Sequence, residues 1–349
     1  MKTFALAGKQ ILFEGGSRGS IFVEDTLFQP SIDQAIFLET EGGIKGYSEI
    51  MSKEDYKDGE GHFEGNWKTI TFDEVEIGSR IGGGGVGVVY NGWYKDEPVA
   101  LKTLFDPRVD EKLKQEYLDE LLTMSALQHP NIVEFIGACM EPPDLFFVME
   151  LCNASLFDLL HNQRAQFCLK DKIAMAIDIA KAMQYLHNRD PCIIHRDLKS
   201  MNLLMSNSGV LKLCDFGLVK TKNTTAGTPC YMAPELLKNS FFNKKVDVYA
   251  FAILLWEILE EQIPFCNCEP QEIMKLVGDG ERPHLSMGYN EEVRCLIQDC
   301  WAQDPADRPD FDEILGSLEL IDSQIPEKTS VELLQDDFGG DALDGLLGK

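Results

Sequence analysis

Four polar side chains stand at the ends of apolar runs, and their chemical types suit the handling of a phosphate and a proton. Lys102 and Asp215 each follow an apolar run, and Asp197 and Asn202 lie five residues apart between two more. A lysine ammonium is a point charge suited to phosphate oxygens. Asp197 is suited to accept a hydroxyl proton. Asn202 and Asp215 offer oxygen ligands of the kind that Mg²⁺ takes alongside water and phosphates.

A glycine-rich segment precedes Lys102. Gly82, Gly84 and Gly87 form a GxGxxG pattern, which is a weak signal alone because dinucleotide-binding folds share it. In those folds a helix opens at the last glycine, whereas the run 88–90 (Val-Val-Tyr) favours a strand. A glycine-rich hairpin between strands lets backbone N–H groups approach phosphates without Cβ clashes. The flanking residues therefore argue against a dinucleotide-dependent oxidoreductase.

Lys102 needs a partner that holds its ammonium in place. The plain alternative is a solvated lysine on an edge strand, but the glycine-rich hairpin upstream favours the phosphate role. Glu120 lies beside Leu121 on a predicted helix and is the expected partner, and Glu116, one turn earlier, is the competing choice.

The surrounding pattern predicts the elements that position these residues. Strands are expected at Val75–Arg80, Val86–Trp93, Pro98–Leu104, Ile132–Cys139 and Leu145–Leu151, and helices at Asp110–Gln128, Lys170–Asn188 and Val246–Leu259. The last helix is apolar almost all round, which indicates burial in a large core. A β-rich block with one helix followed by a helix-rich block predicts an α+β fold of two lobes with a cleft between them.

Five motifs now occur in one order. They are GGGGVGVV, VALK, HRDLKSMN, DFG and Ala233-Pro234-Glu235, and together they resemble the protein kinases from Trp67 to about Ile321. The resemblance implies a bilobal kinase domain at 67–323, with an N-lobe at about 67–150 and a C-lobe at about 151–323. Residues 1–66 are then an N-terminal extension and residues 324–349 an acidic flexible tail.

The resemblance also implies roles for single residues. Lys102 would contact the α- and β-phosphates with Glu120 holding it, Asp197 would be the base, Lys199 would contact the γ-phosphate, and Asn202 and Asp215 would bind Mg²⁺, or Mn²⁺ in its place. The ATP site would be formed by Ile81, Gly82, Gly83, Gly84, Gly85, Val86, Gly87, Val88, Val89, Ala100, Lys102, Met149 (gatekeeper), Glu150, Cys152 and Leu204.

Other residues take structural or regulatory roles by the same resemblance. Asp247 would accept backbone N–H groups of the catalytic loop, and Glu235 and Arg308 would form a buried ion pair. Arg196 would pair with a phosphate on Thr224 or Thr225, with loop threonines of no regulatory role as the alternative.

The substrate hydroxyl is suggested by the loop residues. Lys199 with Thr228 resembles the serine/threonine-specific arrangement, whereas the segment 129–139 (HPNIVEFIGAC) and the Trp256-Glu257 pair resemble the tyrosine-kinase-like group, akin to Raf and mixed-lineage kinases. We therefore expect a serine/threonine kinase of that group, with dual specificity left open. A pseudokinase scaffold is the other alternative, although Lys102, Asp197, Asn202 and Asp215 are all present.

Charge and cysteine content limit the partners and the compartment. The 349 residues carry a net charge of −26, of which −6, −16 and −4 fall on residues 1–66, 67–323 and 324–349. Such a chain repels nucleic acid and anionic membrane surfaces, and its field favours basic protein substrates. There is no membrane-spanning run. The ten cysteines lack a CxxC pair and indicate a reducing compartment, so a cytoplasmic kinase acting in signalling is expected, activated by an upstream kinase or by autophosphorylation.

Residues 1–66 show no recognisable chemistry. Gln10–Glu14 and Ser20–Glu24 suggest a hairpin, and Lys53–Gly65 suggests a linker. A small β module, a regulatory arm and partial disorder are equally compatible with this composition.

Overall fold

The computed structural model describes residues 2–6, 9–13, 37–40, 43–46, 67–83, 87–104, 121–141, 144–216, 228–238 and 241–326. Residues 1–32 and 33–349 form separate compact units. In the first unit, β1 (Lys2–Leu6) pairs antiparallel with β2 (Lys9–Phe13). The first segment of the expected hairpin, Gln10–Glu14, overlaps β2, whose described partner is β1. The second segment, Ser20–Glu24, lies outside the described residues, so the hairpin stays a prediction.

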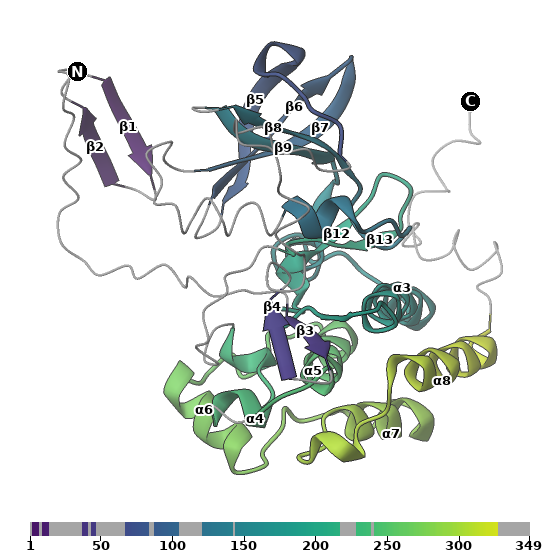
Figure 1. The fold of residues 1–349 in the computed structure, drawn as a ribbon. Helices are drawn as coiled ribbons and strands as arrows, with labels where there is room; N and C mark the ends of the chain where they lie inside the picture. The colour runs from purple at the N-terminus through teal and green to yellow at the C-terminus, as the bar shows by residue number, and fades with distance from the viewer. Residues whose placement is uncertain are drawn as a thin grey trace, which may run out of the picture. The chain divides into compact units, whose positions relative to one another are not determined.

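The second unit contains a five-stranded antiparallel sheet (Figure 1). Its strands, in the spatial order β5-β6-β7-β9-β8, are β5 (Val75–Gly83), β6 (Gly87–Tyr94), β7 (Glu97–Leu104), β8 (Phe135–Glu141) and β9 (Asp144–Glu150). All five predicted strands are present, with boundaries that shift by up to three residues: β5 continues to Gly83, and β8 begins at Phe135 instead of Ile132. Ile132 forms an isolated parallel bridge with Leu213, in which Val133 N donates to Leu213 O and Leu213 N donates to Asn131 O.

Apolar side chains that alternate along the strands stabilise this sheet by packing together on one face. The side chains that face inward form one buried cluster made of Ile70, Val75, Tyr94, Val99, Leu101, Cys139, Phe146 and Val148. Ile70 reaches the cluster because the chain before β5 bonds to β8, with Ile70 N donating to Ala138 O at 2.9 Å and Ala138 N donating to Lys68 O at 3.0 Å. The segment before β5 therefore hydrogen-bonds to the outer edge of β8, the last strand in the spatial order of the sheet.

The remainder is helical, as expected. After residues 121–125, which are helical, come α3 (Leu169–His187), α4 (Pro234–Leu237), α5 (Lys245–Glu260), α6 (Pro270–Gly278), α7 (Glu291–Cys300) and α8 (Phe311–Gln324). Short elements carry the loops between them: β10 (Ala154–Ser155), the π-helical turn η3 (Asp158–Asn162), β11 (Cys192–Ile194), η4 (Ser200–Asn202), β12 (Leu203–Met205), β13 (Leu211–Leu213), η5 (Pro229–Tyr231) and η6 (Pro305–Asp307).

The centre of the helical part is α5. Every residue from Val246 to Leu259 is buried, as the all-round apolar pattern predicts. Two of these residues are acids, Asp247 and Glu257, and both side chains are fully buried. A buried carboxylate is costly unless it is hydrogen-bonded, so both acids must have partners among the segments packed around the helix.

A strand from the N-terminal extension also joins this unit. β3 (Phe37–Thr40) pairs antiparallel with β4 (Gly43–Gly46) on one side and with β11 on the other, with Leu38 opposite Ile193. β11 leads directly into His195. Among the helices of the described ranges, none has the length and apolar character that crossing a membrane requires.

Candidate active site

The glycine-rich segment joins two strands. Gly82 pairs with Val89 and Gly83 with Val88, and β6 begins at Gly87. The prediction of a strand rather than a helix after the glycines is thus confirmed. Gly84, Gly85 and Val86, at the tip, lie outside the described residues.

Lys102 on β7 meets Asp215, two residues after the end of β13. The ammonium lies 2.9 Å from Oδ1 of Asp215, and it also lies over the ring of Phe147. Burial would raise the pKa of Asp215, but the charge and hydrogen bond of Lys102 outweigh it and hold the pKa below its usual value. The two residues therefore form a charged pair at neutral pH. Glu120 and Glu116 lie outside the described residues.

The catalytic-loop residues gather around one carboxylate. Asn202 donates from Nδ2 to both the backbone oxygen (2.9 Å) and Oδ2 (2.7 Å) of Asp197, and Lys199 Nζ lies 2.6 Å from the same Oδ2. Burial raises the pKa of Asp197, and the ammonium of Lys199 opposes that shift. This arrangement suits a carboxylate that exchanges a proton.

Asp247 on α5 holds the loop that carries Asp197. Its Oδ2 accepts from the backbone N–H of His195 at 2.8 Å, and its Oδ1 accepts from that of Arg196 at 2.7 Å. His187 Nε2 lies 2.9 Å from Oδ2 as well. Arg196 has a left-handed backbone (φ 64°), so these bonds support a conformation that non-glycine residues seldom adopt.

Aromatic packing connects this loop with Asp215. The imidazole of His195 is buried and meets the ring of Phe216 edge-on, with centroids 5.4 Å apart. Burial lowers the pKa of His195, which keeps the ring neutral. His195 and Phe216 thus pack behind the loop.

The described members of the expected nucleotide site lie on β5 to β7, β9 and β12, except Cys152, which follows β9. Ala100 pairs with Met149 across β7 and β9, and Leu204 is on β12 opposite Lys212. Val88 and Ala100 are buried, Ile81 is exposed, and Val89, Met149, Glu150, Cys152 and Leu204 are half-buried. Burial raises the pKa of Cys152 to about 11, so this thiol is neutral.

The end of β9 is tied to the helical part by an ion pair that sequence reasoning missed. Lys212 Nζ on β13 lies 2.6 Å from Oε1 of Glu150, and the same oxygen accepts from the backbone N–H of Glu134 at 2.7 Å. No pattern in the sequence marks Lys212, because it occupies an ordinary half-exposed strand position. These contacts fix the chain that leads from Glu150 to Cys152.

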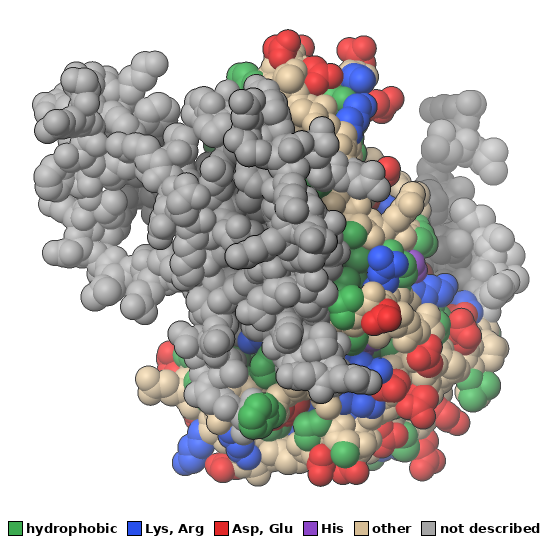
Figure 2. Space-filling view, in the orientation of Figure 1, with side chains coloured by type: hydrophobic (Ala, Val, Ile, Leu, Met, Phe, Trp, Pro, Cys, Tyr) green, Lys and Arg blue, Asp and Glu red, His purple; other side chains and the backbone are tan. Residues whose placement is uncertain are grey.

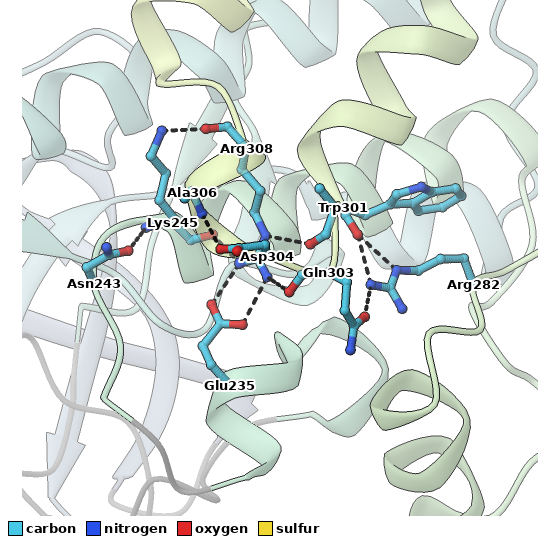
Figure 3. A network of polar contacts seen from close by, with 10 residues as sticks. Glu235, Asn243, Lys245, Arg282, Trp301, Gln303, Asp304, Ala306 and Arg308 are labelled. Atoms are coloured by element: carbon cyan, nitrogen blue, oxygen red, sulfur yellow. Dashed lines mark hydrogen bonds and ion pairs between the residues drawn. The ribbon is translucent and has the colours of Figure 1, made fainter.

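Glu235 and Arg308 are brought together as a bidentate pair (Figure 3). Arg308 Nη1 and Nη2 donate to the two carboxylate oxygens at 2.7 and 2.9 Å. The guanidinium also donates to the backbone oxygens of Ala302 and Lys245, at 2.9 Å each. Arg308 is fully buried, so its charge requires the compensation that this network provides.

The regulatory candidates are only partly described. The guanidinium of Arg196 lies 4.7 Å from the ring centroid of Phe242. Thr224 and Thr225 lie outside the described residues, as do Gly217 and the tail from residue 327.

The residues expected to hold a metal have suitable donor atoms. Asn202 commits its amide nitrogen to Asp197, so its amide oxygen is the atom suited to a cation. Asp215 is kept ionised by Lys102. One amide oxygen and one carboxylate fit Mg²⁺, which keeps water and phosphate oxygens as its other ligands.

Three residues around Glu257 were also missed. Ser200, Tyr231 and His161 bond to its buried carboxylate. A signal was present, since an acidic residue inside an otherwise apolar helix requires partners; it was used for Asp247 but not for Glu257.

Comparison with known proteins agrees with this geometry. The family model described as protein tyrosine and serine/threonine kinase matches residues 75–318. Serine/threonine-protein kinase CTR1 of Arabidopsis thaliana is 39% identical over 282 residues, which are 77% of this chain and 34% of that protein. Serine/threonine-protein kinase STY46 of the same organism is 37% identical over 267 residues, 74% of this chain and 46% of that protein. The chain thus spans between a third and a half of the length of these relatives.

Proposed function

The chain belongs to the protein kinase family, and we propose that it is a serine/threonine kinase of the tyrosine-kinase-like group that transfers the γ-phosphoryl group of ATP to protein hydroxyls. Two contacts carry the proposal: Lys102 with Asp215, and Asn202 with Asp197. The two pairs are neighbours, because the backbone N–H of Cys214, next to Asp215, donates to the backbone oxygen of Asn202 at 2.9 Å. The names of the two relatives support serine/threonine specificity, and Lys199 with Thr228 agrees with it.

The proposed chemistry assigns each of these residues a task. Asp197 accepts the proton of the substrate hydroxyl as the oxygen attacks the γ-phosphorus, and Lys199 offsets the negative charge near that carboxylate. Lys102 places its ammonium beside the α- and β-phosphates, with Glu120 as the proposed holder. Mg²⁺ on Asn202 and Asp215 neutralises phosphate charge when bound. Catalysis then comes mainly from positioning and electrostatic stabilisation.

The proposed nucleotide site uses both parts of the catalytic domain. Val89, Ala100 and Leu204 enclose the adenine, and Glu150 and Cys152 present backbone groups to its edge. Met149 at the gatekeeper position narrows the space behind them. The ion pair between Lys212 and Glu150 supports this assignment, because it holds the chain segment that presents those backbone groups.

Regulation is proposed to act through the segment after Asp215. A phosphate on Thr224 or Thr225 pairs with Arg196 and orders that segment. The double variant Thr224→Ala/Thr225→Ala is expected to lower activity several-fold, and unchanged activity would contradict the proposal. The activator is an upstream kinase or the protein itself.

Domain boundaries and the extension form a further part of the proposal. We place the catalytic domain at 67–323 and treat residues 1–66 as a regulatory arm. The pairing of β3 with β11, which leads into His195, supports an influence of this arm on the catalytic loop. Activity of a chain lacking residues 1–66 that equals the full chain would oppose a regulatory role.

Charge suggests the substrate type. On the face shown in Figure 2, acidic side chains lie over both the sheet and the helical part. This field favours basic protein substrates. All ten cysteines lie in the described ranges as thiols, which supports action in the cytoplasm.

The decisive experiment is transfer of labelled γ-phosphate from ATP to a generic basic protein. The wild-type chain is expected to label serine and threonine, and Asp197→Asn is expected to be inactive. Equal signals from the two proteins would favour a pseudokinase scaffold. Labelled tyrosine would instead show dual specificity.

A further inference from the structure

A buried carboxylate that the proposed chemistry does not use lies next to the catalytic loop. Glu257 on α5 is fully buried. Its Oε1 accepts from the hydroxyl of Ser200 at 2.8 Å and lies 2.8 Å from Nε2 of His161, and its Oε2 accepts from the hydroxyl of Tyr231 at 2.6 Å. Because a buried carboxylate is costly unless it is compensated, each of these partners contributes to keeping it there.

The partners come from three separate segments. Ser200 lies between Lys199 and Asn202, the two residues that contact the Asp197 carboxylate. Tyr231 ends η5, the short helix that begins directly after Thr228. His161 belongs to η3. Glu257 therefore joins the catalytic loop and the segment after Thr228 through a single side chain.

The hydroxyls of Ser200 and Tyr231 are also in contact with each other. Their oxygens lie 3.3 Å apart. Burial, followed by the negative charge of Glu257, raises the pKa of Tyr231 well above its usual value, so the phenol keeps its proton and donates it. Ser200 and Tyr231 thus each donate to one oxygen of the Glu257 carboxylate, and their two hydroxyl oxygens lie side by side.

We propose that Glu257 is a positioning residue that fixes the catalytic loop against the segment after Thr228, and so sets how the substrate hydroxyl meets Asp197. This inference rests on the proposed kinase function. Ser200 and Tyr231 connect Glu257 to the catalytic loop and to the segment after Thr228. Neither Lys102 nor the expected nucleotide-binding residues belong to this set of hydrogen bonds. Loss of a bond in the cluster should therefore slow the transfer step without weakening nucleotide binding.

The test uses Ser200→Ala, Tyr231→Phe and their double variant in the full chain. Each single variant is expected to lower kcat by about ten-fold, the effect of one hydrogen bond to a charged group. The KM for ATP should stay within about two-fold of wild type. The double variant should lose less than the product of the single losses, because both act through one carboxylate.

Tyr289→Phe is the matched control. Tyr289 donates its hydroxyl to the backbone oxygen of Leu259 at 2.7 Å, so the variant also removes a tyrosine hydrogen bond to α5 but leaves Glu257 untouched. It is expected to lower Tm and keep kcat. Glu257→Gln, which preserves size, is expected to lower kcat at least as much as either single variant.

Two results would overturn the inference. One is that Ser200→Ala and Tyr231→Phe change Tm like the control and leave kcat unchanged, which would make the cluster a purely stabilising one. The other is that their losses in kcat multiply. A wild-type chain no more active than Asp197→Asn would instead remove the proposed function itself, so the two failures are distinguishable.

Discussion

Lys102 and Asp215 are 113 positions apart in the chain, and their side chains meet at 2.9 Å. The ion pair joins β7 of the sheet to the segment that follows β13 in the helical part. It brings the charge expected on phosphate oxygens next to a carboxylate expected on Mg²⁺. The side chains are 18% and 35% exposed, so a ligand is able to reach both.

Lys102→Met is expected to lower kcat/KM by about a hundred-fold or more, because it removes a fixed positive charge from the phosphate site. The measurement is steady-state phosphoryl transfer with ATP varied. Lys275→Met, on an exposed position of α6, is the control and should remain as active as wild type. A Lys102→Met protein with normal kcat/KM would remove Lys102 from the proposed site.

The same variant should change how stability depends on pH. Lys102 lowers the pKa of Asp215 in the folded protein, so the pair adds stability above the pKa of an unfolded aspartate. That stability is lost as the pH falls through the lowered pKa. Urea unfolding of wild type on acidification should show this loss, and Lys102→Met should show less of it.

The acid limb of the activity profile should respond to Lys199. Burial raises the pKa of Asp197 and Lys199 opposes the shift, so Lys199→Met should move the limb to higher pH. The base is active only when it is deprotonated, which fixes this direction. Lys199→Arg keeps the charge and should keep the limb near its wild-type position. Single-turnover rates against pH provide the measurement, and coincident limbs in Lys199→Met and wild type would contradict the assignment.

Arg308→Met should destabilise the fold by about 3–5 kcal/mol, since it leaves the buried charge of Glu235 without its partner. Chemical denaturation measures this change. Lys244→Met is the contrasting variant, because its ammonium lies 3.5 Å from Asp310 in a partly exposed pair and should contribute less than about 1 kcal/mol. Equal losses would show that burial does not decide the strength of these pairs.

Gly137→Ala should destabilise the sheet by about 1–3 kcal/mol. A Cβ at Gly137 would collide with the backbone oxygen of Lys68 and press on Ile70, where the chain before β5 bonds to β8. Gly278→Ala at the end of α6 is the control, since no atom would lie within 4 Å of the added Cβ. A neutral Gly137→Ala in thermal unfolding would show that the preceding segment is free to shift.

Local chemistry was readable from the sequence. Glycines followed by a β-prone run predicted the strand at Gly87, and a carboxylate inside an apolar helix predicted that Asp247 is hydrogen-bonded. Both inferences depend on neighbours in the chain, whereas the partners of Asp247 in the catalytic loop were implied by the resemblance to kinases. The fold class followed from the order of β-rich and helix-rich blocks.

Other contacts between distant segments were not readable, although the resemblance to kinases implied the pair of Glu235 and Arg308. The residues next to Ser200 and Tyr231 in the sequence do not indicate that both side chains bond to Glu257. The pairing of β3 with β11 depends on which strand edge has unpaired backbone groups in the folded protein. The late start of β8 has the same origin, because the backbone of Asn131 and Val133 on either side of Ile132 is hydrogen-bonded to Leu213. Such choices are made by tertiary packing, to which local propensity is a weak guide.

Asp247 and Glu257 are ten residues apart on the same buried helix, α5. At 1.5 Å per residue this separation is about 15 Å, and a buried helix can neither stretch nor turn. The register of α5 therefore dictates the spacing between the chain at His195 and the chain at Tyr231. One residue inserted between Asp247 and Glu257 would rotate one acid by about 100° relative to the other, so only one of the two attachments could survive. The number of helical residues between Asp247 and Glu257 thus sets the distance between the catalytic loop and the segment after Thr228.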